Sequence, residues 1–132
     1  MAEKIKFELV APERLLIDEP VDMVVVPGVE GDFGVLPRHA PLIAAVRPGV
    51  INVHNDGAVT ERIFVGGGFA EVTGERCTVL ADEALPIAEI DRAATEKAIA
   101  ELTEQLSVAD PDEKAPLTRR LAVAQAKLAA AA

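Results

Sequence analysis

Residues Val26–Ile51 read VPGVEGDFGVLPRHAPLIAAVRPGVI, a run in which glycine or proline recurs every few positions. Glycine permits positive φ angles, and proline fixes φ at about −65°. The backbone path of this run is therefore specified almost residue by residue. It also carries four polar side chains, those of Glu30, Asp32, Arg38 and His39. We interpret the run as part of a small β domain that holds these side chains in place for docking rather than for catalysis.

Residues 1–85 alternate between apolar and polar positions in short runs separated by turn residues. This pattern predicts an all-β domain, an antiparallel β-sandwich of about ten short strands. Ile5, Phe7 and Leu9 supply the apolar face of the first strand. The tripeptide Asn55-Asp56-Gly57 predicts a hairpin turn, because Asp-Gly tolerates the positive φ angles of tight turns.

Two further stretches of the β region carry local predictions. Val21–Val26 becomes apolar on both faces toward its end, which indicates a strand with neighbours on both sides. Gly66–Gly68 follow a strand, as the glycines of a phosphate-binding loop do. No Gly-Lys-Ser/Thr follows them, however, and the next segment has the pattern of a strand rather than a helix. We therefore expect a bulge or a sharp corner between two strands there.

Residues 86–132 change to helical periodicity and predict a helical hairpin. Asp91 is the expected cap of a first helix that ends near Ser107, and Asp110-Pro111 is the expected start of a second. Pro116 requires that the second helix either bends there or begins its regular part there. The apolar stripes of both helices are short and rich in alanine. We therefore expect a hairpin that docks weakly on the sandwich and adopts more than one position.

Length and composition exclude several classes of protein. The chain has 132 residues, enough for one domain or one small domain with an appendage. Its formal net charge of −9 argues against nucleic acid as a partner. Cys77 is the only cysteine, so no internal disulfide forms, and we expect a small buried residue in an apolar strand. No apolar run approaches the ~18 residues that span a bilayer, so we expect an intracellular chain without direct membrane insertion.

Few residues could carry chemistry by themselves. His39 and His54 have no cysteine or carboxylate at the spacing of a zinc site, so we predict no metal. Glu30 and Asp32 could be read as a catalytic pair of a hydrolase. Nothing around them in the sequence supplies a pocket that would separate their pKa values. We expect no catalytic residue and no cofactor.

Three ordered motifs point to one family. They are EGDFGVLPRHAPL at Glu30–Leu42 with RPGVI at Arg47–Ile51, then GGFAEV at Gly67–Val72, and LADEA at Leu80–Ala84. In this order, and followed by a helical tail, they resemble the epsilon subunit of the rotary F-type ATP synthase of bacteria. The resemblance covers nearly the whole chain.

The resemblance implies a non-catalytic rotor-stalk subunit. Such a subunit joins the shaft subunit gamma to the membrane c-ring, and its C-terminal helices restrain ATP hydrolysis. It would lie peripherally on the cytoplasmic face of the bacterial inner membrane. In this family the loop region faces the rotor ring, which makes Glu30, Asp32 and His39 the candidate ring contacts. A solvated acidic loop is the alternative interpretation.

The last helix is basic in an otherwise acidic chain. From Glu113 onward the charged residues are Lys114, Arg119, Arg120 and Lys127 against Glu113 alone. An ordinary solvated helix face would explain this. The resemblance implies another role, in which the C-terminal helices extend into the catalytic head and basic residues meet acidic segments of the alpha and beta subunits. Arg119, Arg120 and Lys127 are our candidates for that contact.

One family feature does not transfer. Some bacterial epsilon subunits bind ATP through an Ile/Leu-Asp-x-x-Arg-Ala pattern at the start of the first tail helix. Here Ile90–Thr95 reads IDRAAT, with Arg92 directly after Asp91 and Ala94 where the pattern has Arg. Residues one apart on a helix diverge by about 100°, so we assign no nucleotide site.

The sequence leaves one structural rival open. A free-standing β-sandwich binding module whose helical tail dimerises would use the apolar stripe of its last helix. The residues available for that contact are Leu117, Leu121 and Leu128.

Overall fold

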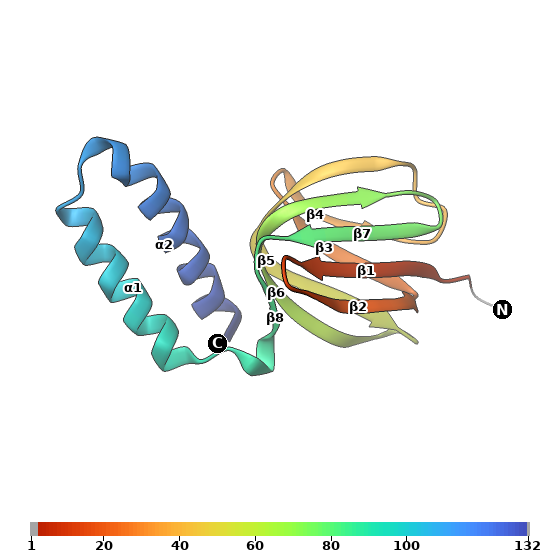
Figure 1. The fold of residues 1–132 in the computed structure, drawn as a ribbon. Helices are drawn as coiled ribbons and strands as arrows, with labels where there is room; N and C mark the ends of the chain where they lie inside the picture. The colour runs from red at the N-terminus through yellow and green to blue at the C-terminus, as the bar shows by residue number, and fades with distance from the viewer. Residues whose placement is uncertain (1–2, 132) are drawn as a thin grey trace.

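The computed structural model describes residues 3–131, in which eight strands precede a pair of helices (Figure 1). The strands are β1 (Ile5–Ala11), β2 (Arg14–Val21), β3 (Met23–Gly28), β4 (Gly31–Val35), β5 (Leu42–Asn55), β6 (Ala58–Val72), β7 (Arg76–Ala81) and β8 (Ala84–Pro86). A 3-10 turn, η1 (Ile87–Glu89), leads to α1 (Arg92–Ser107) and α2 (Pro111–Ala131). The predicted antiparallel β domain followed by a helical hairpin is confirmed.

The strands form one folded sheet in the order β2-β1-β7-β6-β5-β3-β4, with β8 added to β6. Neighbouring strands are antiparallel except β1 and β7, which run parallel. The long strands β5 and β6 stay paired over nearly their whole lengths. They therefore belong to both layers of the sandwich and connect them along one side.

The corner in β6 lies at the glycines where the sequence predicts it. Before Gly66–Gly68, Ile63 and Val65 point into the core, whereas after them Ala70 and Val72 do. The inward face thus changes from odd to even positions across the glycines. Gly67 and Gly68 have φ angles of 105° and 141°, which other residues rarely adopt. β6 accordingly pairs with β8 before the corner and with β7 after it.

The predicted number of about ten short strands is too high for the described residues. The expected strands at 58–65 and 69–72 are one strand, β6, because its pairing with β5 continues through the corner. The expected strand at 50–54 is likewise the second half of β5. Conversely, Val21–Val26 is interrupted at Asp22. The Asp22 N–H donates to the carbonyl oxygen of His54 at 3.1 Å and to Oδ1 of Asn55 at 3.1 Å, outside the ladder.

Aliphatic side chains fill the space between the layers. Ile5, Phe7 and Leu9 of β1 are fully buried, as their alternation predicts. β3 lies between β4 and β5, so it has neighbours on both sides as expected, and Val24 and Val26 face the core. The prediction that Cys77 is a small buried residue is also confirmed. Burial raises the pKa of its thiol to about 12, so the group stays protonated.

The turns and helix caps follow local chemistry. Asp56 and Gly57 form a two-residue hairpin turn with φ angles of 53° and 77°. Asp91 caps α1, because its carboxylate accepts a hydrogen bond from the Ala94 N–H at 3.0 Å. Pro116 lies inside α2, whose helical stretch already begins at Pro111. Its exposed side chain lets one unpaired carbonyl of the preceding turn face solvent.

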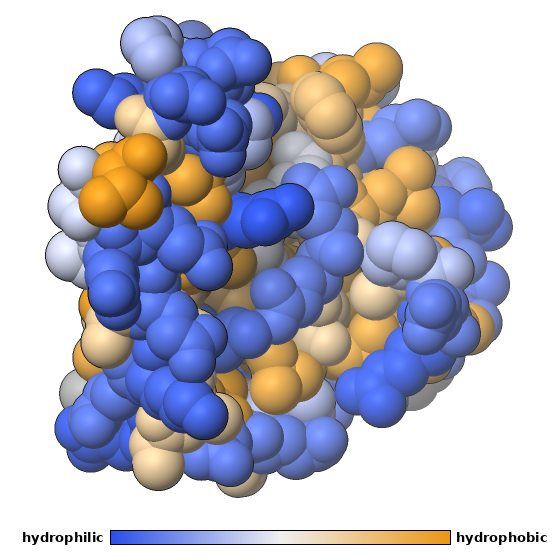
Figure 2. Space-filling model, turned by 60° about the vertical axis from the view of Figure 1, so that its left-hand side comes forward, coloured by the Kyte–Doolittle hydropathy of each residue, from blue (hydrophilic) through white to orange (hydrophobic). Residues whose placement is uncertain are grey.

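The hairpin packs beside the corner of the sandwich rather than over its core (Figure 1). Phe64 of β6 is fully buried but lies outside the main core cluster. Its ring lies beneath α2, where Lys127 Nζ is 5.7 Å from the ring centre. Figure 2 turns the hairpin toward the viewer and shows mostly hydrophilic residues on it, with apolar residues between them. Within residues 3–131, neither helix has the length and apolarity needed to cross a bilayer.

Candidate functional site

The acidic candidates lie at the turn between β3 and β4. Gly28 and Gly31 flank this two-residue turn, and a Cβ on Gly28 would lie 2.6 Å from the Gly31 carbonyl oxygen. Glu30 and Asp32 are exposed there. Arg47 of β5 fixes the second carboxylate: Nη2 lies 2.5 Å from Asp32 Oδ1, and Nη1 donates to the Gly28 carbonyl oxygen at 2.5 Å. Asp32 is therefore held in place while staying accessible.

His39 lies at the opposite end of β4. It belongs to the loop 36–41, which joins β4 to β5 and is tied to the β6–β7 turn by a 2.7 Å hydrogen bond from the Arg38 N–H to the Gly74 carbonyl oxygen. The imidazole Nδ1 is 2.6 Å from the Ala40 carbonyl oxygen. Arg38 adopts a φ of 68° and pairs with Glu3. The three predicted ring contacts therefore divide into two places rather than forming one site.

The chemistry of the β3–β4 turn is that of recognition. The Asp32 carboxylate is neutralised by a guanidinium and open to solvent, so it lacks the dry pocket that a general acid needs. Next to it lie two exposed apolar side chains, Val29 and Ile43, with exposed fractions of 61% and 75%. Together with the start of β5 they line a shallow groove along the turn. Charged and apolar groups side by side on a rigid turn suit a protein contact.

The three basic candidates of α2 differ in their surroundings. Arg119 and Arg120 are exposed and lie beside a hollow between α2 and the corner, which Gly66, Asp82 and Glu83 also line. Among the described residues neither guanidinium forms an ion pair. They are available to another molecule.

Lys127, the third basic candidate, is already engaged within the chain. Its ammonium pairs with Glu83 and lies over the Phe64 ring, and its side chain is 23% exposed. Our sequence reasoning missed both partners. One signal was present for Phe64: Ile63, Phe64 and Val65 are consecutive apolar residues, which indicates a strand buried on both faces. Nothing local indicated Glu83.

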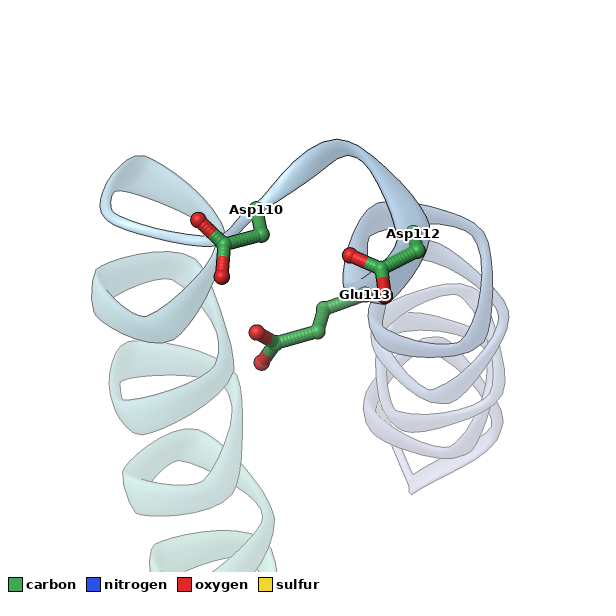
Figure 3. A group of neighbouring side chains, drawn as sticks. All are labelled: Asp110, Asp112 and Glu113. Atoms are coloured by element: carbon green, nitrogen blue, oxygen red, sulfur yellow. The ribbon is translucent and has the colours of Figure 1, made fainter.

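Three carboxylates meet at the turn between the helices, as Figure 3 shows. Asp110, Asp112 and Glu113 are exposed and can bring oxygen atoms within 4.8 Å of one another. Each has an explanation without an ion. The Asp110 carbonyl accepts from the Glu113 N–H at 2.9 Å, and the other two lie in the first turn of α2, where the helix dipole favours negative charge. We assign no metal site to them.

The start of α1 shows no convergent nucleotide ligands. The Asp91 carboxylate accepts from the Ala94 N–H, and Arg92 turns toward Glu96 at 4.0 Å. Both side chains are therefore directed to neighbours on the helix itself. The leucines that a dimerising tail would use are half-buried in the folded hairpin: Leu117, Leu121 and Leu128.

Comparisons with known proteins agree with this architecture. A family model described as ATP synthase, Delta/Epsilon chain, beta-sandwich domain matches residues 4–87. The chain is 56% identical over 131 residues to the ATP synthase epsilon chain of Rhodospirillum rubrum, and the match covers 98% of each chain. It is 53% identical over 133 residues to the ATP synthase epsilon chain of Paramagnetospirillum magneticum, with 100% of each chain covered.

Solved structures show the same fold. A chain of the Euglena gracilis mitochondrial ATP synthase, in a structure of OSCP, F1 and c-ring, superposes with a TM-score of 0.83 at 26% identity. That superposition covers 98% of this chain and 82% of the other. A chain from the central stalk and c-ring of the Tetrahymena thermophila enzyme gives a TM-score of 0.66 at 13% identity, a likeness of fold alone.

Proposed function

Because the chain belongs to the epsilon-chain family of ATP synthase, we propose that it is a non-catalytic subunit of the rotor stalk. In this role it joins the shaft subunit gamma to the membrane c-ring and restrains ATP hydrolysis through its C-terminal helices. One observation carries the proposal. The match to epsilon chains extends over 98% of the chain, so it includes the hairpin as well as the sandwich.

The β3–β4 turn supports a contact with the c-ring. Glu30 is exposed, and Asp32 is held by Arg47 without being covered. A rigid, accessible acidic turn can transmit torque, because neither its backbone nor its carboxylate has to be ordered on contact. His39 lies at the other end of β4 and, in this proposal, contacts the stalk at a second place.

The hairpin supports the restraint of hydrolysis. We infer that residues 86–132 act as a regulatory tail on the sandwich of residues 1–85. Arg119 and Arg120 are exposed and unpaired within residues 3–131, so they can meet acidic segments of the alpha and beta subunits. Lys127 reaches such a segment only after it leaves Glu83 and Phe64. Contact with the catalytic head then competes with docking of the hairpin on the sandwich.

This role also defines the location that we propose. As a subunit of ATP synthase without a bilayer-spanning helix in residues 3–131, the chain would lie at the periphery of the complex. We place it on the cytoplasmic face of the bacterial inner membrane, held there by gamma and the c-ring.

The test measures ATP hydrolysis by a catalytic head complex that lacks its epsilon subunit. The complex is titrated with the full chain, with a double variant Arg119→Ala/Arg120→Ala, and with the matched control Lys114→Ala, an exposed lysine of the same helix. A version ending at Ile90 removes both helices but keeps β8, whose residues pair with Ile63–Val65. Circular dichroism checks that this version folds.

The full chain and the Lys114 control should suppress turnover. The double variant should bind with a severalfold weaker suppression, and the version ending at Ile90 should bind without suppressing. Binding without suppression by the full chain would leave a coupling subunit whose tail does not restrain hydrolysis. Failure of the full chain to bind would contradict the proposed function itself.

A further inference from the structure

The outer face of the layer made by β5, β6, β7, β1 and β2 carries a row of exposed apolar residues. The strand register places five of them directly side by side, and a sixth lies two positions along β5 on the same face. These six residues, here called the apolar row, are Ile43, Ala45, Phe69, Leu80, Val10 and Leu15.

The members of the apolar row point away from the core. Ala70 and Val79, their neighbours along β6 and β7, are fully buried, whereas Phe69 and Leu80 are 61% and 57% exposed. Leu15 is 54% exposed. Soluble monomers seldom expose contiguous apolar patches, and such patches mark interaction sites.

Phe69 stands at the centre of the row. It lies opposite Ala45 on one side and Leu80 on the other. The other phenylalanines of the chain are buried or half-buried. An exposed aromatic ring surrounded by aliphatic side chains has the composition of a binding anchor, which contributes most of the energy of an interface.

The chain does not cover this surface itself. α2 docks at the corner, over Phe64 and beside Glu83. The exposed fractions of Phe69 and Leu80 are those with the hairpin already docked. The occupant of the apolar row is therefore a different molecule.

Charge beside the row selects among occupants. The register places Ile43, Glu71, Thr78 and Glu8 in the adjacent line across the strands. Glu8 is paired with Arg76 at 3.3 Å, whereas Glu71 is exposed and forms no ion pair within the described residues. The chain carries a net charge of −9, which opposes a second copy and an anionic lipid surface. A partner with basic residues at its border is favoured.

We propose that the apolar row, with Phe69 as its anchor, binds a neighbouring subunit of ATP synthase whose contact surface is apolar and bordered by Lys or Arg. The inference rests on the proposed function, because that function supplies the neighbouring subunit. It adds the surface through which the sandwich is held, which is separate from the β3–β4 turn and from α2.

The test compares binding of variants to ATP synthase of the same organism from which this chain has been removed. Phe69→Ser and Leu80→Ser remove apolar side chains of the row. Val59→Ser is the matched control, since Val59 lies on the same strand as Phe69 and is 46% exposed. Glu71→Lys tests the charge, with Glu104→Lys, an exposed residue of α1, as its control. All substituted positions are exposed, and circular dichroism checks the fold.

We expect Phe69→Ser to raise Kd by about tenfold or more, as loss of a binding anchor does. Leu80→Ser and Glu71→Lys should raise it severalfold, and the wild-type affinity should fall with salt more steeply than that of Glu71→Lys. Both controls should stay within about twofold of the wild type.

Cysteine labelling gives a second readout that does not depend on affinity. Cys77 is fully buried with a raised pKa, so a thiol reagent should label only an introduced cysteine. Phe69→Cys should react in the free chain and be protected in the assembled complex. Val59→Cys should react in both.

Two outcomes would overturn the inference. A Phe69→Ser variant that binds like the wild type, together with an unprotected Phe69→Cys, refutes the surface while leaving the proposed function intact. A free chain that self-associates through Phe69, shown by sedimentation, would assign the surface to a second copy instead. A wild-type chain that does not bind the depleted enzyme would refute the proposed function, and this inference would fail with it.

Discussion

Lys127 near the end of α2 forms an ion pair with Glu83, 44 residues earlier in the chain, at the point where the hairpin meets the sandwich. The same ammonium lies 5.7 Å from the centre of the buried Phe64 ring. The two contacts place a single side chain between the last helix, the β7–β8 connection and the outward face of β6. The docked position of the hairpin therefore depends strongly on Lys127.

Lys127→Ala should loosen the hairpin without unfolding the sandwich. The variant loses a half-buried ion pair and a cation–π contact, each of which contributes about 0.5–1 kcal/mol. Hydrogen exchange of the Phe64 and Val65 amides should become several times faster, because local opening of the hairpin exposes the β6–β8 pairing. Lys114→Ala, at an exposed position of α2, is the control. Equal exchange in both variants would show that apolar contacts alone hold the hairpin.

Gly68→Ala should be strongly destabilising. Gly68 has a φ of 141°, and a Cβ there would lie 2.0 Å from the Leu80 carbonyl oxygen. Strain of this kind costs about 1–3 kcal/mol before the clash is counted, so we expect a loss of at least about 2 kcal/mol in the free energy of unfolding. Urea unfolding measures it. Gly74→Ala is the control, since its Cβ would make only an ordinary contact at 3.6 Å, and a similar loss there would refute the argument.

Asp91→Ala should destabilise the start of α1. The carboxylate caps the Ala94 N–H, and the Asp91 carbonyl accepts from the hydroxyl of the buried Thr95 at 2.8 Å. Loss of an N-cap costs about 0.5–2 kcal/mol, whereas Asp91→Asn keeps an oxygen that caps. Hydrogen exchange in the first turn of α1 should increase for alanine and change little for asparagine. If both variants behaved alike, the cap would not be the source of the stability.

Glu61→Gln should stabilise the protein at neutral pH but not in acid. Partial burial raises the pKa of the Glu61 carboxyl above its ordinary 4.5, and a hydrogen bond with Glu19 and repulsion by its charge add to the effect. A raised carboxyl pKa means that the folded state holds the proton more tightly. Stability is therefore lost as pH rises from 4.5 through the folded-state pKa.

The measurement for Glu61 is the free energy of unfolding as a function of pH. The gain of Glu61→Gln over the wild type should appear above the folded-state pKa and vanish below about pH 4.5. Glu104→Gln on α1 is the control, which should show no such pH-dependent gain. A gain that is the same at every pH would contradict a role for the shared proton.

The features that could be predicted are those set by neighbours in the sequence. Alternation at Ile5, Phe7 and Leu9 defines an inward face before any partner strand is known, because successive side chains of a strand point to opposite sides. Asp56-Gly57 and the Asp91 cap act within a few residues. Their free energy does not depend on the rest of the fold.

What the sequence by itself determined is therefore the type and order of elements: a β domain with a glycine corner, followed by two capped helices. Only the tertiary structure decided that β1 pairs in parallel with β7, that Phe64 lies beneath α2, and that Lys127 meets Glu83. It also separated His39 from Glu30 and Asp32 at the two ends of β4, and aligned Phe69 with Leu80. These contacts join residues far apart in the chain. Each depends on which surfaces are buried when the whole chain folds, and no local dihedral preference encodes that.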